Sequence, residues 1–184
     1  MAGWCSGVHA REIVEAGGNV GISSKAGDIK ATTVNANGGY AFLNATGNTT
    51  VDEVKATDEV ILTATNGKVL VNKGVTADDY VLVQGKEVEL KGNVWSSEGN
   101  INVAATDGNV TAKEITSNLA SVSVEATGNV VADVVKAGQA TTVKATDINI
   151  NKEAWSNNGA LTLDAKGNNN RRYFWYRIIM YKCI

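Results

Sequence analysis

Residues 95–109 read WSSEGNINVAATDGN, and the chain carries a similar sequence about sixty residues to either side. Residues 35–48 read NANGGYAFLNATGN, and residues 155–168 read WSNNGALTLDAKGN. Shorter copies lie between them, such as VILTATNG at 60–67 and VSVEATGN at 122–129. The spacing of these copies divides the chain into units of about twenty residues, which is typical of a repeat protein.

Each unit contains a five-residue segment in which apolar positions alternate with polar ones. The aligned rows are Ile22/Ser24/Ala26, Ala41/Leu43/Ala45, Val60/Leu62/Ala64, Val81/Val83/Gly85, Ile101/Val103/Ala105, Val122/Val124/Ala126, Thr141/Val143/Ala145 and Leu161/Leu163/Ala165. Alternation with a period of two predicts a strand with one buried face. The third position holds only Ala or Gly, which predicts a tight corner of the fold.

Two further segments follow in each unit. The inward candidates of the second segment are Ile29/Ala31, Thr49/Val51, Val69/Val71, Val88/Leu90, Val110/Ala112, Val130/Ala132 and Ile148/Ile150, and those of the third are Val34, Val54, Val75, Val94, Ile115, Val135 and Ala154. Turns rich in Gly and Asn separate the first two segments, and both residue types tolerate positive φ angles.

Three short strands in every twenty residues, with no helical periodicity, predict an all-β right-handed parallel β-helix, or β-solenoid. The right-handed sense follows from the chirality of parallel crossover connections. We expect about eight coils of about 20 residues each. At about 4.8 Å per coil, they would form a rod roughly 38 Å long. We place the solenoid at residues 14–167, between a non-repeat segment, 1–13, and an atypical tail, 168–184.

The composition restricts the possible partners. The 184-residue chain has 43% hydrophobic residues, 6% aromatic residues and no proline. Absence of proline suits a chain that is mostly strand, because proline removes a ladder donor. Outside the basic residues Arg171, Arg172, Arg177 and Lys182, the chain has 13 basic residues against 19 acidic ones. An acidic body with no basic stripe predicts no nucleic-acid partner.

Targeting signals are missing from the sequence. No segment reaches the eighteen or so apolar residues of a membrane-spanning helix, so we predict no membrane span. The first eighteen residues lack the apolar core of a signal peptide. We therefore expect a fragment of a longer secreted or cell-surface protein, without that protein's signal peptide. Cys5, Cys183 and His9 form no disulfide framework or metal-binding motif.

The tail at 168–184 has a different composition from the repeats and holds five of the eleven aromatic residues. We favour an end unrelated to the repeats, such as a translated frameshift. The alternative is a capping strand that adheres to a membrane surface or to another chain. Without a polar cap, the coil edges are expected to allow end-to-end self-association.

One acidic cluster is a candidate site. Asp58, Asp78, Asp79 and Glu98 recur at intervals of about twenty residues, so we expect them at one angular position on three successive coils. Such an acidic ladder can bind calcium or supply the acid and base of sugar cleavage. A solvated polar turn explains the same residues, and the loss of charge in later units favours that interpretation.

Trp95 and Trp155 are the second candidate, as a ligand-binding pair at one corner three coils apart. Exposed aromatic rings stack on sugars, but a tryptophan at a corner more often covers the apolar edge of a turn, and we favour packing. No nucleotide-binding, phosphate-binding or catalytic motif is present. We therefore predict no catalytic residue, no metal and no cofactor.

The repeats resemble a known family. Residues 99–130 (GNINVAATDGNVTAKEITSNLASVSVEATGNV) and 126–150 (ATGNVVADVVKAGQATTVKATDINI) are similar to the repeats of filamentous haemagglutinin and related large exoproteins of two-partner secretion. The resemblance covers residues 14–167. It implies a segment of a long β-helical adhesin stalk, exported through an outer-membrane transporter. We find no counterpart of the family's N-terminal secretion domain in this sequence, because residues 1–13 are too short.

These observations lead to three functional hypotheses. The first is a non-catalytic stalk of a secreted or cell-surface bacterial adhesin, whose parent molecule binds a host surface glycan or protein. The second is a β-helix polysaccharide lyase or glycosidase that uses Asp58, Asp78 and Glu98. The third is a glycan-binding module that uses Trp95 and Trp155. The uniform unit length favours the stalk, since β-helix enzymes need long loops to build a cleft.

Overall fold

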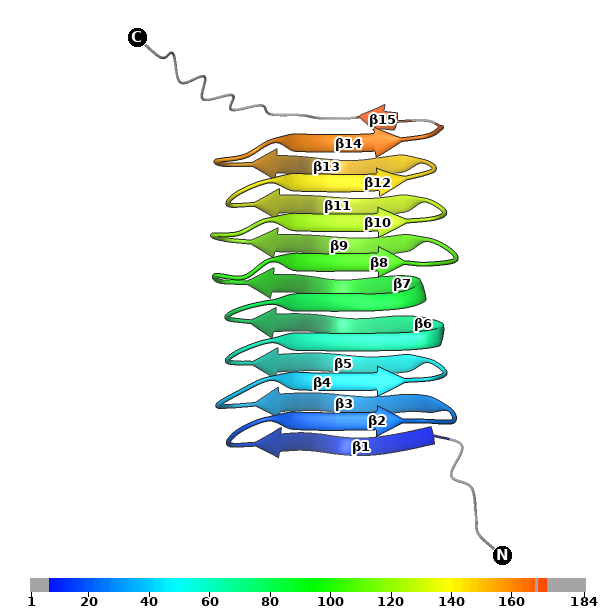
Figure 1. Ribbon diagram of the computed structural model, residues 1–184, viewed down its shortest axis with the longest axis vertical. Coiled ribbons are helices and arrows are strands. Elements are labelled where there is room, and N and C mark those ends of the chain that lie inside the picture. The colour runs from blue at the N-terminus through cyan, green and yellow to red at the C-terminus, as the bar shows by residue number, and fades with distance from the viewer. Residues whose placement is uncertain (1–6, 168, 172–184) are drawn as a thin grey trace, which may run out of the picture.

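The computed structural model describes residues 7–167 and 169–171, which form a parallel β-solenoid of about eight turns (Figure 1). The strands are β1 (Gly7–Ala16), β2 (Val20–Ser24), β3 (Asp28–Ala36), β4 (Ala41–Ala45), β5 (Thr49–Ala56), β6 (Val60–Ala77), β7 (Val81–Ser96), β8 (Ile101–Ala105), β9 (Val110–Ser117), β10 (Val122–Ala126), β11 (Val130–Ala137), β12 (Thr141–Ala145), β13 (Ile148–Ser156), β14 (Leu161–Ala165) and β15 (Asn169–Arg171). This part of the chain contains no helix. The predicted all-β solenoid is confirmed.

Each coil pairs with the coils before and after it through two ladders of parallel strands. One ladder, here called the first side, joins β2, β4, the start of β6, the start of β7, β8, β10, β12 and β14. The other joins β1, β3, β5, the rest of β6, the rest of β7, β9, β11, β13 and β15. Equivalent residues of successive units therefore stack in columns along the solenoid axis.

The expected division of each unit into three separate strands is wrong. The second and third segments belong to one strand, as in β3, which contains both Ile29 and Val34. In β6 and β7 a single strand includes all three segments. The strands bend at bulges, where the register shifts, for example between Val51 and Glu53. In β3, β5, β9 and β11, two adjacent residues lie outward at the bend, so the chain turns a corner while the backbone ladder continues.

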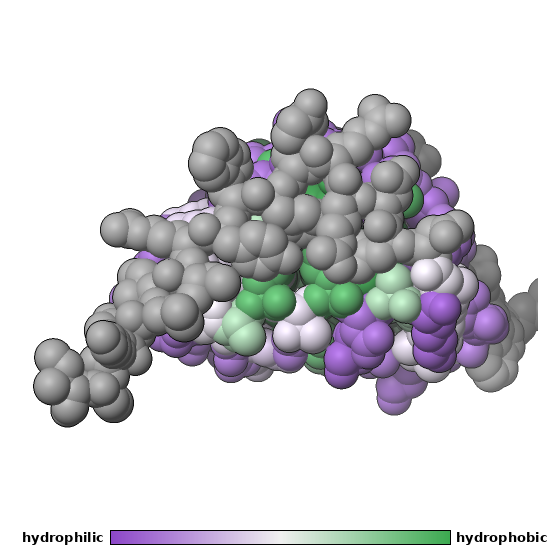
Figure 2. Space-filling model, turned by 90° about the horizontal axis from the view of Figure 1, so that it is seen from above, coloured by the Kyte–Doolittle hydropathy of each residue, from purple (hydrophilic) through white to green (hydrophobic). Residues whose placement is uncertain are grey.

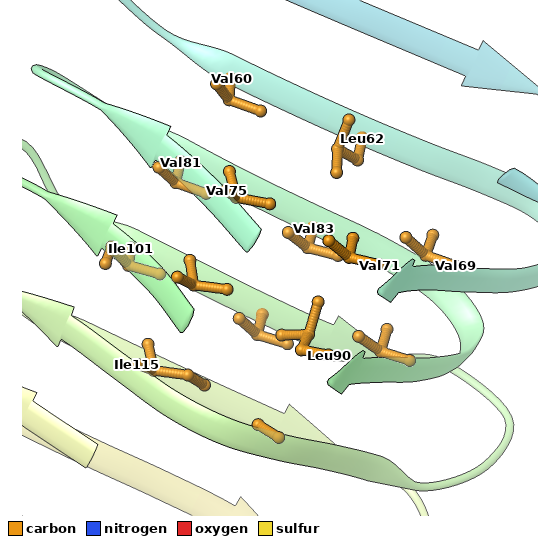
Figure 3. Packing of buried hydrophobic residues seen from close by; sticks show 14 of the residues in the cluster. Val60, Leu62, Val69, Val71, Val75, Val81, Val83, Leu90, Ile101 and Ile115 are labelled. Atoms are coloured by element: carbon orange, nitrogen blue, oxygen red, sulfur yellow. The ribbon is translucent and has the colours of Figure 1, made fainter. Parts of the chain in front are cut away.

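The inward columns form one continuous apolar core (Figure 3). Every inward candidate predicted for the second and third segments is buried. Leu62, Val83 and Leu90 are at most 1% exposed and pack among the valines of neighbouring coils. Aliphatic residues stacked in this way bury most of their surface against the same column in the next coil, and this burial is the main stabilising term of the fold.

The first row of the sequence alignment was displaced by two residues. β2 pairs with β4 through Val20↔Ala41, Ile22↔Leu43 and Ser24↔Ala45, so the row is Val20/Ile22/Ser24. Ala26, which the alignment placed inward, is exposed in the turn after β2. The third column therefore contains a serine in this coil, and Ser24 is 8% exposed there.

The turns do not use positive φ angles, contrary to the expectation from their Gly and Asn content. In the described residues no glycine and no other residue has a positive φ. Close approach between coils explains most of the turn glycines instead, although Gly17 and Gly18 have open space around them. A Cβ on Gly128 would lie 2.9 Å from the carbonyl oxygen of Gly108 in the preceding coil. Successive turns stack too closely for a side chain that points along the axis.

In several coils, a polar side chain forms a hydrogen bond with the corner before the second segment of the next coil. The backbone N–H of Asn48 donates to Asp28 Oδ1 at 2.7 Å, and the N–H of Lys68 donates to Asn48 Oδ1 at 2.9 Å. Higher in the stack, the N–H of Asn129 donates to Asn109 Oδ1 at 2.7 Å. These side chains satisfy turn amides that the strand ladders do not reach, so they fix the spacing of successive corners.

Asn48→Ala is expected to lower the free energy of unfolding by about 1 kcal/mol, because the N–H of Lys68 loses its acceptor. Asn66→Ala is the matched control, since the Asn66 side chain is exposed and makes no hydrogen bond with the described residues. It should change stability by less than about 0.5 kcal/mol. Urea unfolding of both variants measures the difference, and equal effects would contradict the role of the Asn48 side chain.

Strand pairing at the two ends of the stack extends past residues 14 and 167, the predicted limits of the sequence repeat. β1 begins at Gly7 and pairs with β3 across residue 14, so strand pairing starts before the sequence repeat becomes recognisable. At the other end, β14 pairs only with β12 among the described residues, and Leu161 and Leu163 are partly buried. Figure 2 shows apolar surface at this end of the stack. Of the tail, residues 168 and 172–184 lie outside the described residues, as does Cys5.

Candidate functional site

The acidic residues singled out in the sequence lie in the turns that lead into the first side. Asp58, Asp78, Asp79 and Glu98 belong to the turns before β6, β7 and β8, and all four are exposed. The N–H of Asp79 donates to the Asp58 carbonyl at 3.2 Å, and that of Glu98 donates to the Asp78 carbonyl at 2.8 Å. The solenoid therefore stacks these residues at one corner of three successive coils.

Stacking does not by itself make a metal site. Within residues 7–167 and 169–171, no group of three His, Cys, Asp or Glu side chains is arranged to hold a metal ion. Exposed carboxylates on successive turns are free to point away from one another into solvent, which lowers their mutual repulsion. Calcium binding at this corner stays a hypothesis, and melting curves with and without EDTA test it.

Trp95 and Trp155 lie in one outward column on the third segment of their coils. Trp95 is paired with Thr76 and Thr116, and Trp155 with Lys136. Both tryptophans are half-buried. Three coil steps separate them by about 14 Å along the axis. Because Thr116 and Lys136 lie between the two indoles, the rings do not form a continuous aromatic surface.

Charged side chains on the second strands form short ladders of ion pairs. Lys68 Nζ contacts Glu89 and also Glu87, the latter at 3.1 Å, and Lys91 Nζ lies 3.6 Å from Glu89. The hydrogen bond with Lys68 lowers the pKa of Glu89, and the same bond raises the pKa of Lys68. The group stabilises its own charged forms and leaves no unpaired base, so it serves as a structural cluster on the surface.

The Lys68–Glu89 pair makes stability depend on pH. A carboxyl whose folded pKa is lowered contributes stability above its unfolded pKa, near 4.5, and loses it as the pH falls through the folded value. Glu89→Gln should therefore lower stability at pH 7 by less than about 1 kcal/mol, with the difference vanishing in acid. Glu125→Gln is the control, because its partner Lys144 is 3.5 Å away and both side chains are over half exposed. Thermal melts at pH 7 and in acid compare the two.

An open hollow of about 450 Å³ lies along the corner that follows β8, β10, β12 and β14. It forms because small residues of the third column, such as Ala105 and Ala126, leave space at this corner. Its rim carries Glu125, Lys144 and Asp164, which stack in register in alternating charge. These charges offset one another, and the hollow presents no arranged nucleophile and base.

One surface feature was not predicted from the sequence. Phe42, Ile61 and Leu82 stack in register on the outside of the first side, and each is partly exposed. The sequence contains a signal for this surface, because three strands have apolar residues at both inward and outward positions. These residues form the triplets Ala41-Phe42-Leu43, Val60-Ile61-Leu62 and Val81-Leu82-Val83. Single exposed apolar residues are ordinary, but apolar residues that adjoin one another on the outward face are a candidate binding surface.

Comparisons of the chain with protein-family models, curated proteins and solved structures give no match. The described residues include no helix of the length and apolarity needed to cross a bilayer. The parallel β-solenoid is compatible with both an adhesin stalk and a carbohydrate-active β-helix.

Proposed function

We propose that this chain is a non-catalytic stalk segment, which holds other parts of a longer protein at a distance. The uniformity of its coils carries the proposal. Every connection between described strands, from β1 to β14, is two to four residues long, as at Thr146–Asp147 and Asn37–Tyr40. A continuous core and stacked columns make such coils additive, so the length of the rod scales with the number of repeats.

The same geometry disfavours the enzymatic hypothesis. A polysaccharide-cleaving site needs a concave pocket that surrounds its substrate, and long loops on a solenoid build the walls of such a pocket. Around Asp58, Asp78 and Glu98 the connections are three or four residues long. The carboxylates there are exposed to water, whereas acid–base catalysis is favoured in a site that excludes water.

The resemblance of residues 14–167 to filamentous haemagglutinin-like exoproteins supports the rest of the proposal. The parent would be a secreted or cell-surface bacterial adhesin, exported by an outer-membrane transporter. It would contact a host glycan or protein through regions other than the coils. The partly buried Leu161 and Leu163 at the edge of β14 would pack against a further coil or against another copy.

Two measurements on the full chain test the stalk. Small-angle scattering should give an elongated particle at least roughly 38 Å long, with one constant cross-section. A panel of neutral and acidic polysaccharides should remain uncleaved. Cleavage that is lost in Asp78→Asn, with an unchanged melting temperature, would replace the stalk with the enzymatic hypothesis.

A further inference from the structure

The outside of the first side carries a compact apolar surface where β4, β6 and β7 stack, here called the platform. Its central column is Phe42, Ile61 and Leu82, which pair in register from β4 to β6 to β7. The platform ends sharply, because the same column holds Gly21 in the coil before and Asn102 in the coil after. Higher coils carry Ser123, Thr142 and Thr162 in this column.

Hydrogen-bonding side chains border the apolar column on one edge. The residues immediately before the strands of this side are Tyr40, Glu59, Tyr80 and Asn100. Each of their carbonyls accepts a hydrogen bond from the N–H that begins the strand of the preceding coil, so the four residues lie in one column. Tyr40 is 44% exposed. The hydroxyl of Tyr80 accepts a hydrogen bond from Asn102 Nδ2 at 2.9 Å, so this ring lies on the outer face.

The other edge of the platform is polar and neutral. Asn44, Thr63 and Gln84 pair in register there. Thr63 Oγ1 donates to Asn44 Oδ1 at 2.8 Å, and the Asn44 amide nitrogen and both polar atoms of the exposed Gln84 amide have no hydrogen-bond partner among the described residues. The three columns on these coils contain a single charged side chain, Glu59.

The size of the platform restricts its occupant. Three coils at about 4.8 Å and three columns about 6.6 Å apart give a flat area of roughly 200 Å². A stable protein–protein interface buries about 800 Å² on each partner, so a second copy or a folded protein would need far more surface. A flat face of this size accommodates two or three sugar rings.

We propose that this face binds a neutral glycan chain, whose rings lie along the solenoid axis over Phe42, Ile61 and Leu82. A pyranose ring presents an apolar C–H face and a rim of hydroxyl groups. The C–H face would cover the apolar column, while the hydroxyls reach Tyr40 and Tyr80 on one edge and Asn44 and Gln84 on the other. With one carboxylate and no cation in these columns, the face offers nothing to attract an anionic polymer.

The stalk would then carry a contact surface along its length, in addition to its spacing role. A flat face encloses less of a ligand than a pocket does, so the expected Kd for one hexasaccharide is about 1 mM. Repetition of such a face on a long parent molecule would raise the overall avidity.

Saturation-transfer NMR on the full chain tests the proposal with cellohexaose and chitohexaose as neutral probes and a hyaluronan hexasaccharide as the anionic one. The neutral probes should bind, and the anionic one should not. The triple variant Phe42→Thr, Ile61→Thr and Leu82→Thr should weaken binding at least about tenfold. Threonine occurs in the same column at Thr142 and Thr162, so the strand accommodates it.

Two further variants keep the result interpretable. Tyr40→Ala alters an exposed ring that makes no contribution to the core and should weaken binding several-fold even if the triple variant fails to fold. Trp95→Ala with Trp155→Ala, on another side of the coil, should leave binding unchanged.

The proposal is overturned if neither neutral probe binds at about 10 mM, if Tyr40→Ala binds as the wild type does, or if the tryptophan variant loses binding. Concentration-dependent dimerisation that the triple variant abolishes would also overturn it, by assigning the face to a second copy. The scattering and cleavage results that test the stalk are independent of each of these outcomes.

Discussion

Leu62→Ala is expected to lower the free energy of unfolding by about 2–5 kcal/mol. Leu62 is fully buried in β6, between Leu43 of the preceding coil and Val83 of the next. Removing three carbon atoms from this column leaves a cavity that the stacked backbones cannot close, because the parallel ladders hold successive coils at a fixed spacing. Urea unfolding followed by circular dichroism measures the loss.

The neighbouring residue provides the matched control. Ile61 precedes Leu62 in the same strand but points outward and is partly exposed. Ile61→Ala removes a similar volume without creating an internal cavity, so its cost should be about 1 kcal/mol or less. If the two substitutions had equal effects, the assignment of inward and outward faces in this strand would be wrong.

The inward columns could be predicted from the sequence because two constraints act on them together. A residue such as Val103 must satisfy the alternation within its strand and must also match Val83 and Val124 in adjacent coils. Only apolar side chains meet both requirements along a continuous core. The recurrence of valine about every twenty residues is therefore direct information about burial.

The position of the first coil in the repeat alignment could not be predicted as well from the sequence. A shift of two residues leaves the alternation of a strand unchanged, so Ile22/Ser24/Ala26 fits the pattern as well as Val20/Ile22/Ser24 does. The pairing with β4 selects the second row. Sequence alternation fixes which face a residue occupies, and contacts with the next coil fix its position along the strand.

The outer surface was the least predictable part. Trp95 and Trp155 are conspicuous residue types in the sequence, yet the structure separates them by two coils that carry Thr116 and Lys136. Conversely, the apolar triplets that contain Phe42, Ile61 and Leu82 can be recognised in the sequence, but only the strand register shows that these three residues lie side by side. A surface site in a solenoid depends on neighbours about twenty residues apart, which a local motif does not reveal.

Gly92→Ala is expected to be among the most destabilising single-methyl additions in the chain. Gly92 lies in β7 at the register shift between Leu90 and Asn93, in the pairing of β7 with β9 of the next coil. A Cβ at this position would overlap the carbonyl group of Lys73. Since the obstacle is backbone, flanked by the paired residues Val71 and Gly74, a side-chain rotation cannot relieve the overlap. The coils must separate locally, which should cost about 1–3 kcal/mol or more.

Gly21→Ala should have the opposite sign. Gly21 lies in β2 and points outward, and a Cβ there would have no atom within 4 Å. Neither glycine has a positive φ, so alanine introduces no backbone strain at Gly21 and reduces the conformational freedom of the unfolded chain. The expected effect is a stabilisation of about 0.4–1 kcal/mol. Melting temperatures that fall in Gly92→Ala and hold or rise in Gly21→Ala would separate close approach between coils from a general intolerance of alanine in these strands. A fall of equal size in both variants would show instead that β2 and β7 depend on glycine for another reason.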